Sequence, residues 1–132
     1  MKLQSHSTSN PTSIAQKAAV EAMRGPQDSV QRMLAEYRKR RDFVIARLRA
    51  IPGVRCAEPQ GAFYAYPNIG TALGKNGIAN TMQFAERLLA EAHVAVVPGE
   101  AFGTDQHVRI SYATSMKELE RGLDRIHKFI AA

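Results

Sequence analysis

A strand-like alternation near the end of the chain constrains the fold most. Residues 96–113 read VVPGEAFGTDQHVRISYA, and within them Val108, Ile110 and Tyr112 fall on one side of an extended chain. His107, Arg109, Ser111 and Ala113 fall on the other side. A strand of this kind buries one face and leaves the other in water, so the stretch predicts a half-exposed sheet.

The remaining pattern supplies helices to cover that sheet. Apolar residues recur with a helical period at 13–23, 28–50, 80–92 and 116–130. Strands are predicted at 54–57 and 62–66, joined as a hairpin-like unit, then at 94–97, which reads as buried, and at 107–112. The order α, α, β, β, α, β, β, α predicts an α+β fold, a small and mostly antiparallel sheet covered by helices. The small-residue face of the first helix predicts that it packs closely.

Composition limits the class of protein. The 132 residues suit one domain, and 45% hydrophobic with 23% charged residues indicates a globular chain. No apolar run approaches the roughly 20 residues that span a bilayer, and the start lacks the apolar region of a signal peptide. The single cysteine, Cys56, fits a reducing compartment and is predicted to be a buried, unreactive thiol. We therefore expect a cytoplasmic protein with no membrane partner.

The net charge of +6 raises the question of a nucleic-acid partner. The densest basic run, YRKRRD at 37–42, lies inside a predicted helix beside Glu36 and Asp42, which is typical of a solvated helix face. No zinc-finger spacing or aromatic interleaving accompanies it, so we expect no nucleic-acid partner, although a basic nucleic-acid-binding domain stays as an alternative. The four histidines are scattered, which predicts no metal site.

Arg109 has two interpretations on the residues alone. It is either an ordinary solvent-facing arginine or a guanidinium that binds a carboxylate or phosphate. The preceding loop, VVPGEAFG, must expose backbone, and ligand-binding residues often lie on such loops. No paired carboxylates or nucleophile motif are present, so no catalytic residue is predicted.

Five stretches in order carry a family resemblance. They are KLQSHSTSNPTSIAQKAAVEAM, YRKRRDFVIARL, PQGAFYAYPNI, FAERLLAEAHVAVVPGEAFG and HVRISYATSMKELERGLDRI. Together they resemble the C-terminal part of class I/II aminotransferases, the fold-type I pyridoxal-phosphate enzymes, near the aspartate aminotransferase branch. The resemblance implies the small C-terminal domain of such an enzyme. Residues 1–27 would be an interface segment and first helix, 28–50 a long interdomain helix, and 51–132 the small α+β domain, all within the single domain 1–132.

The resemblance also implies roles for individual residues. Arg109 matches the arginine that binds the α-carboxylate of the substrate, and Gly61 and Phe63 match the start of a strand that faces the active site. Pro98, Gly99 and Phe102 match the loop that closes over the substrate. Ser9 and Asn10 match a stretch near the cofactor phosphate at the subunit interface of these dimers.

The implied activity is transfer of an amino group from an amino acid, aspartate or a broad set, to a 2-oxo acid. Pyridoxal 5'-phosphate is the implied cofactor, and a homodimer the implied assembly. None of the six lysines matches the motif of the lysine that holds this cofactor. The chain is therefore expected to be a fragment that binds no cofactor and is inactive alone. A stand-alone module that binds carboxylates or dimerises is the alternative.

Overall fold

The computed structural model describes residues 9–132, and the chain divides into two compact units between Met33 and Leu34. The first unit holds α2 (Ser13–Arg24) and the first residues of α3 (Asp28–Arg49). The second holds the rest of α3, the strands, α4 (Thr81–Ala92) and α5 (Met116–Ala131). In the part of the chain that the structure describes, no helix is both long and apolar enough to span a membrane.

Helix α2 forms where the sequence predicts it, but it does not pack as predicted. The Thr12 hydroxyl accepts a hydrogen bond from the Ala15 amide at 3.3 Å and so caps its first turn. No residue of α2 is buried, and the side chains of Ile14 and Met23 are 81% and 83% exposed. Small residues permit close approach, but burial needs a partner surface, and the described part of this unit supplies none.

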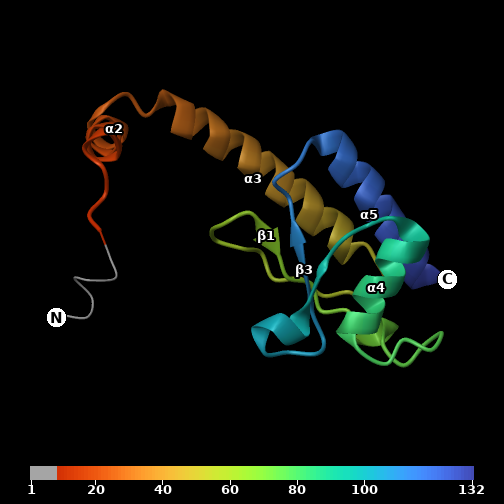
Figure 1. Ribbon diagram of the computed structural model, residues 1–132. Coiled ribbons are helices and arrows are strands. Elements are labelled where there is room, and N and C mark those ends of the chain that lie inside the picture. Colours follow the sequence, from red (N-terminus) through yellow and green to blue (C-terminus); the bar gives the residue numbers. More distant parts are fainter. Residues whose placement is uncertain (1–8) are drawn as a thin grey trace. The chain divides into compact units, whose positions relative to one another are not determined.

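Three strands form an antiparallel sheet in the order β1-β3-β2. They are β1 (Tyr64–Ala65), β2 (Val97–Pro98) and β3 (Val108–Ser111), and β3 is the middle strand. Ala65 lies opposite Ile110, and Val97 lies opposite Arg109. Figure 1 shows β1 and β3 side by side, with α5 next to the C-terminal half of α3. The α+β prediction of a small antiparallel sheet with helices is confirmed.

Two predicted strands are wrong in detail. Residues 54–57 form no strand, and only Arg55 pairs, as an isolated antiparallel bridge to Asn68. Extended in the same register, this pairing would place Pro59 opposite Tyr64 of β1, and Pro59 has no N–H to donate. Val94, Val96 and Val97 are half-buried, Ala95 is exposed, and β2 begins only at Val97. His93 ends α4 in the left-handed conformation, and the Val94 amide donates back to Leu88, so this segment completes the helix end instead.

The core lies on one face of the sheet. Ala65, Val108 and Ile110 contribute the sheet side of this core. The helices contribute a second set of buried side chains, namely Val44, Ile45 and Leu48 of α3, Phe84 and Leu88 of α4, and Leu119, Leu123 and Ile126 of α5. Each such side chain contributes about 1.5–3 kcal/mol on burial. The opposite face of the sheet, with Arg109 and Ser111, is therefore left for other uses.

The burial of Cys56 generates the first testable prediction. The residue is 7% exposed, and burial raises the pKa of its thiol, an effect partly offset by a backbone hydrogen bond from Tyr66 and by the charge of Arg49. Because the thiolate is the reactive form, labelling with a thiol reagent at about pH 8 should be slow. We expect the folded chain to react about tenfold or more slowly than the same chain in concentrated urea. Equal rates in the two conditions would contradict the burial of this thiol.

Candidate functional site

Arg109 lies between two aromatic rings on the exposed face of the sheet. Its guanidinium carbon lies 4.3 Å from the ring centroid of Tyr64 and 4.6 Å from that of Phe102. Tyr64 comes from β1, and Phe102 ends the short helix η2 (Gly99–Phe102) that follows β2. A cation over an aromatic face is attracted by the ring quadrupole, so the two rings hold the guanidinium from β1 and from the loop after β2. We call Tyr64 and Phe102 the aromatic clamp.

The hydrogen-bonding groups of Arg109 are not used within the described chain. Among residues 9–132, no carboxylate lies within ion-pair distance of its guanidinium, and its side chain makes no hydrogen bond. The residue is half-buried. A planar guanidinium with five N–H donors and a permanent positive charge suits a bidentate carboxylate. The arrangement can therefore bind a small carboxylate at its outer edge.

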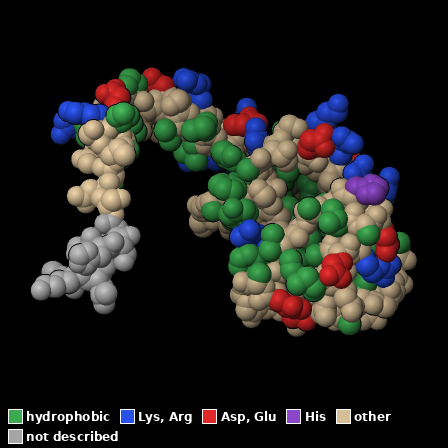
Figure 2. Space-filling view, viewed as in Figure 1, with side chains coloured by type: hydrophobic (Ala, Val, Ile, Leu, Met, Phe, Trp, Pro, Cys, Tyr) green, Lys and Arg blue, Asp and Glu red, His purple; other side chains and the backbone are tan. Residues whose placement is uncertain are grey.

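Tyr66 packs against Phe102 of the clamp and against His107. Its ring stacks on His107 with centroids 4.9 Å apart and meets Phe102 edge-on at 5.9 Å. Its hydroxyl donates to the Gly99 carbonyl at 3.4 Å. Tyr64, Tyr66 and His107 also line an open pocket of about 590 Å³. Figure 2 shows one face of the molecule, on which hydrophobic side chains gather over the region of the strands with a Lys or Arg side chain among them.

The loop that carries Phe102 is fixed at two points. A Cβ at Gly99 would lie 2.3 Å from the backbone oxygens of both His107 and Thr104, so only glycine fits this close approach. The Asp105 carboxylate accepts from the amide and the hydroxyl of Thr81 at 2.8 and 2.9 Å. Thr81 is fully buried at the first position of α4, where a negative charge also meets the positive end of the helix.

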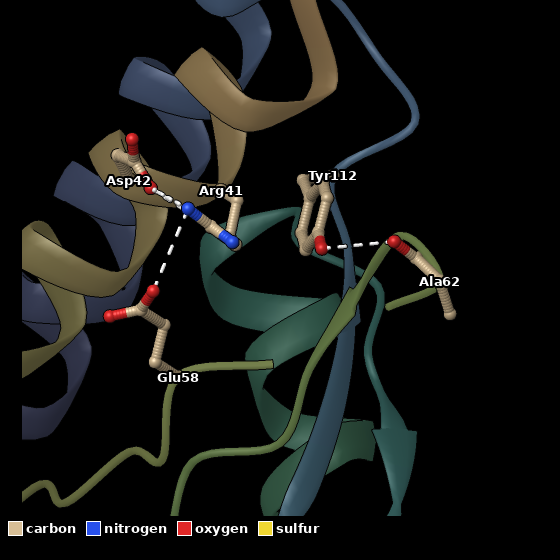
Figure 3. Close-up of polar contacts among 5 residues, drawn as sticks. All are labelled: Arg41, Asp42, Glu58, Ala62 and Tyr112. Carbon is tan, nitrogen blue, oxygen red and sulfur yellow. Dashed lines mark hydrogen bonds and ion pairs between the residues drawn. The ribbon is translucent and has the colours of Figure 1, made fainter. Parts of the chain in front are cut away.

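The turn before β1 is held by a hydrogen bond from Tyr112. Tyr112 is 2% exposed and donates its hydroxyl proton to the Ala62 carbonyl at 3.1 Å. Burial raises the pKa of Tyr112, so its hydroxyl keeps the proton that it donates at neutral pH. In the same region Arg41 pairs with Asp42 and Glu58, and the hydrogen bond to Asp42 raises the pKa of Arg41 (Figure 3).

The structure brings some of the predicted site residues together. Phe102 contacts Arg109 directly, and Phe63 reaches it through Tyr64, whose ring centroid lies 4.5 Å from that of Phe63. Gly61 lies exposed in the turn before β1 and lines a separate pocket of about 220 Å³ with Tyr37 and Tyr112.

Ser9 and Asn10 belong to the N-terminal unit of the chain, and Arg109 belongs to the other unit. Both are exposed, and both precede α2 in the N-terminal unit. Ser7 and Thr8 of the same stretch lie outside the described residues. Their assignment to the cofactor phosphate stays a prediction.

Three aromatic residues of the site were not predicted as functional. Alternation along 62–66 separates Tyr64 and Tyr66 from the core, but only the pairing of β1 with β3 places them on the same face as Arg109. Tyr112 reads as a core residue from its spacing, and nothing in the sequence signals that its hydroxyl meets the Ala62 carbonyl.

The donor set fits a carboxylate better than it fits an aldehyde cofactor. An aldehyde is held by a lysine amine, and no lysine of the described chain lines the pocket beside Tyr64 and His107. Within residues 9–132, no cluster of three or more His, Cys, Asp or Glu side chains could hold a metal ion. The amine that would hold an aldehyde cofactor is thus not among the side chains that line this pocket.

The chain was compared with known proteins. The family model described as aminotransferase class I and II matches residues 1–126. Aspartate aminotransferase from Bacillus sp. (strain YM-2) is 48% identical over 128 residues, which cover 97% of this chain and 33% of that protein. Aspartate/prephenate aminotransferase from Cereibacter sphaeroides is 46% identical over 134 residues, covering 98% of this chain and 34% of that protein.

Solved structures give the same result. The crystal structure of the aspartate aminotransferase from Rhizobium meliloti superposes with a TM-score of 0.89 at 44% identity, over 98% of this chain and 34% of that one. An alanine aminotransferase from Pyrococcus furiosus superposes with a TM-score of 0.83 at 34% identity, over 92% of this chain and 30% of that one. The chain thus spans about a third of the length of these relatives.

The anchor of the η2 loop gives a prediction. Asp105→Ala leaves the buried amide and hydroxyl of Thr81 without their acceptor, so we expect a loss of about 1–3 kcal/mol in the free energy of unfolding. Chemical denaturation measures this loss. Glu86→Ala is the matched control, because Glu86 is exposed on the same helix α4. Equal losses in the two variants would contradict the anchoring role of Asp105.

Proposed function

This chain belongs to the aminotransferase class I and II family, and from that premise we propose that it is the C-terminal, substrate-binding domain of a pyridoxal-phosphate-dependent amino acid aminotransferase. Its role is to hold the α-carboxylate of the amino acid or 2-oxo acid on Arg109. One observation carries this assignment, namely a guanidinium fixed between two rings with no partner for its N–H groups among the described residues. The relatives, about three times as long, support the assignment to one part of a larger enzyme.

The geometry explains how Arg109 would orient a substrate. Two parallel N–H···O bonds fix both the position and the plane of a carboxylate, and so fix the direction of the neighbouring Cα–H bond. The aromatic clamp limits rotation of the guanidinium and keeps water from its two faces. A side chain ordered in advance loses less conformational freedom when the substrate binds.

The remaining chemistry is assigned to the rest of the intact enzyme. Pyridoxal phosphate supplies the electron sink for amino-group transfer when it is bound. No lysine of the described residues lines the pocket beside Tyr64 and His107, so no step of the reaction is assigned to this chain's own amines. The roles of Ser9 and Asn10 near the cofactor phosphate, the homodimer and the cytoplasmic location belong to the same proposal and rest on the resemblance.

Side-chain specificity is proposed only as aspartate or a broad set. The similar proteins include aspartate, aspartate/prephenate and alanine aminotransferases. An α-carboxylate is the group that all amino acid and 2-oxo acid substrates share. The binding of that shared group by Arg109 is therefore compatible with each of these substrate preferences.

A stand-alone module is the second candidate, and the exposed apolar side chains of the first unit favour it. Ile14 and Met23 on α2 and Met33 on α3 are 81%, 83% and 56% exposed, and such a surface favours association. A module of this kind would dimerise or bind carboxylates without any part in transamination.

A chimera tests the leading proposal. In it, this chain replaces the corresponding third of the Bacillus sp. aspartate aminotransferase, and transamination of aspartate is expected. Arg109→Lys should then lower kcat/KM by about 10²–10³-fold, because an ammonium cannot reproduce two charge-assisted hydrogen bonds. Arg121→Lys, at an exposed position of α5, is the matched control and should leave kcat/KM within about twofold. Full activity of the Arg109→Lys chimera would refute the assignment.

The isolated chain provides a second test. Mixed with pyridoxal phosphate, aspartate and 2-oxoglutarate, it should transfer no amino group, because no lysine of the described chain lines the pocket beside Tyr64 and His107. It should still bind 2-oxoglutarate weakly, seen as movement of the Arg109 Nε–H signal in an NMR titration. Turnover that Arg109→Ala abolishes would show instead that the chain is a complete catalyst. A dimer that binds carboxylates, together with an inactive chimera, would favour the stand-alone module.

A further inference from the structure

The turn at residues 58–63 is tied to the core at both of its ends. At the first end, the Glu58 carboxylate lies 3.6 Å from Nη2 of Arg41 on α3, and the same nitrogen lies 2.8 Å from Asp42. At the second end, the Ala62 carbonyl accepts the Tyr112 hydroxyl at 3.1 Å. Figure 3 shows both attachments, one from α3 and one from the segment after β3. The turn therefore cannot move without breaking contacts to two elements of the core.

Ala62 adopts a conformation that its surroundings must maintain. Its φ is +58°, in the left-handed region that residues with a Cβ rarely occupy. Tyr112 makes two hydrogen bonds to this turn. Its hydroxyl donates to the Ala62 carbonyl, and its amide donates to the Phe63 carbonyl at 2.9 Å. Such strained residues persist where neighbouring contacts over-determine them, and often lie beside functional groups.

The turn leads directly into the aromatic clamp. Tyr64, which contacts the Arg109 guanidinium, follows Phe63 in the chain. The ring of Phe63 lies 4.5 Å from that of Tyr64 and 6.1 Å from that of Tyr37 on α3. The direction in which Tyr64 leaves the turn is thus set by the peptides that Tyr112 holds.

We propose that Tyr112, assisted by Arg41, is a positioning residue that orients Tyr64 against Arg109 and so prepares the guanidinium for a carboxylate. The inference rests on the proposed function of Arg109. Without the Tyr112 hydroxyl, Ala62 relaxes toward negative φ, Tyr64 turns away, and Arg109 keeps only one ring of the clamp. Tyr112 makes the larger contribution, because its side chain is buried and its hydrogen bond is partly buried, whereas the more exposed pair of Arg41 and Glu58 is weakened by water.

The test is Tyr112→Phe in this chain, which keeps the ring and removes only the hydroxyl. Two quantities are measured, namely the NMR signal of the Arg109 Nε–H without ligand, and the dissociation constant for 2-oxoglutarate. We expect the signal to move, because ring currents from Tyr64 change, and the affinity to fall about three- to tenfold. Glu58→Gln should move the same signal in the same direction by a smaller amount.

Thr71→Val is the matched control. The Thr71 hydroxyl also donates to a backbone carbonyl, that of Gly53 at 3.0 Å, and neither residue contacts the clamp. It should lower the thermal midpoint to a similar extent and leave both the Arg109 signal and the affinity unchanged. Should Tyr112→Phe fail to fold, Ala62→Val keeps the Tyr112 hydroxyl and disfavours the left-handed conformation at this exposed position, and it should move the same signal.

Each outcome decides a separate question. An Arg109 signal that stays at its wild-type position in Tyr112→Phe, or in Ala62→Val when that variant is used, overturns the positioning role. Unchanged 2-oxoglutarate binding in Arg109→Lys overturns the proposed function, but the ligand-free signal still decides whether Tyr112 orients the clamp. A larger shift in Glu58→Gln than in Tyr112→Phe would reverse the order of the two anchors and refute the proposal as stated.

Discussion

Burial of one face of β3 is the interaction on which the rest of the structure depends. Val108 and Ile110 lie in the core with side chains of α3, α4 and α5, and their burial fixes the position of the strand against these helices. Because side chains alternate along a strand, the same packing that buries these two residues turns Arg109 outward between them. Core and candidate site are therefore two faces of one element, and the orientation of Arg109 follows from hydrophobic burial rather than from contacts of its own.

The segments beside β3 supply the contacts that hold the Arg109 guanidinium. β1 brings Tyr64 to one side of the guanidinium, and the segment after β2 brings Phe102 to the other. Each ring is held by a polar anchor at some distance, Tyr112 for the turn before β1 and Asp105 for the loop after β2. These anchors lie where the backbone is least regular, at a left-handed alanine and at a glycine that no side chain can replace. The rigidity of the site thus depends on a few buried hydrogen bonds in segments that have no regular structure.

The sequence predicts a helix or strand well where its hydrophobic pattern is long. It predicts a strand poorly where pairing with a neighbouring strand decides whether the strand forms. Periods of 3.6 and of two residues locate the four α-helices of the described residues and the strand of Arg109, and in all of these except α2 one face is buried. The segment 54–57 has strand-like residues, but only Arg55 pairs, and the local pattern contains no information on how far a pairing extends. For the site, Arg109 and Phe102 were predicted from a resemblance. Tyr64 and Tyr112 were not predicted. The role of Tyr64 follows from the register of β1 with β3, and the role of Tyr112 follows from the direction of its hydroxyl.

The register of β2 with β3 has a consequence for how sequences of this kind can vary. Val97 faces Arg109 and Pro98 faces Val108, so the nine residues 99–107 connect two strands whose alignment is already fixed. Loss or gain of a single residue that shifted this alignment by one step would turn the guanidinium into the hydrocarbon interior and an isoleucine into water. The connection can therefore change its amino acids far more readily than its length. We expect insertions and deletions to be tolerated in the exposed segment at 74–77, and to be disruptive where they shift the alignment of β2 with β3.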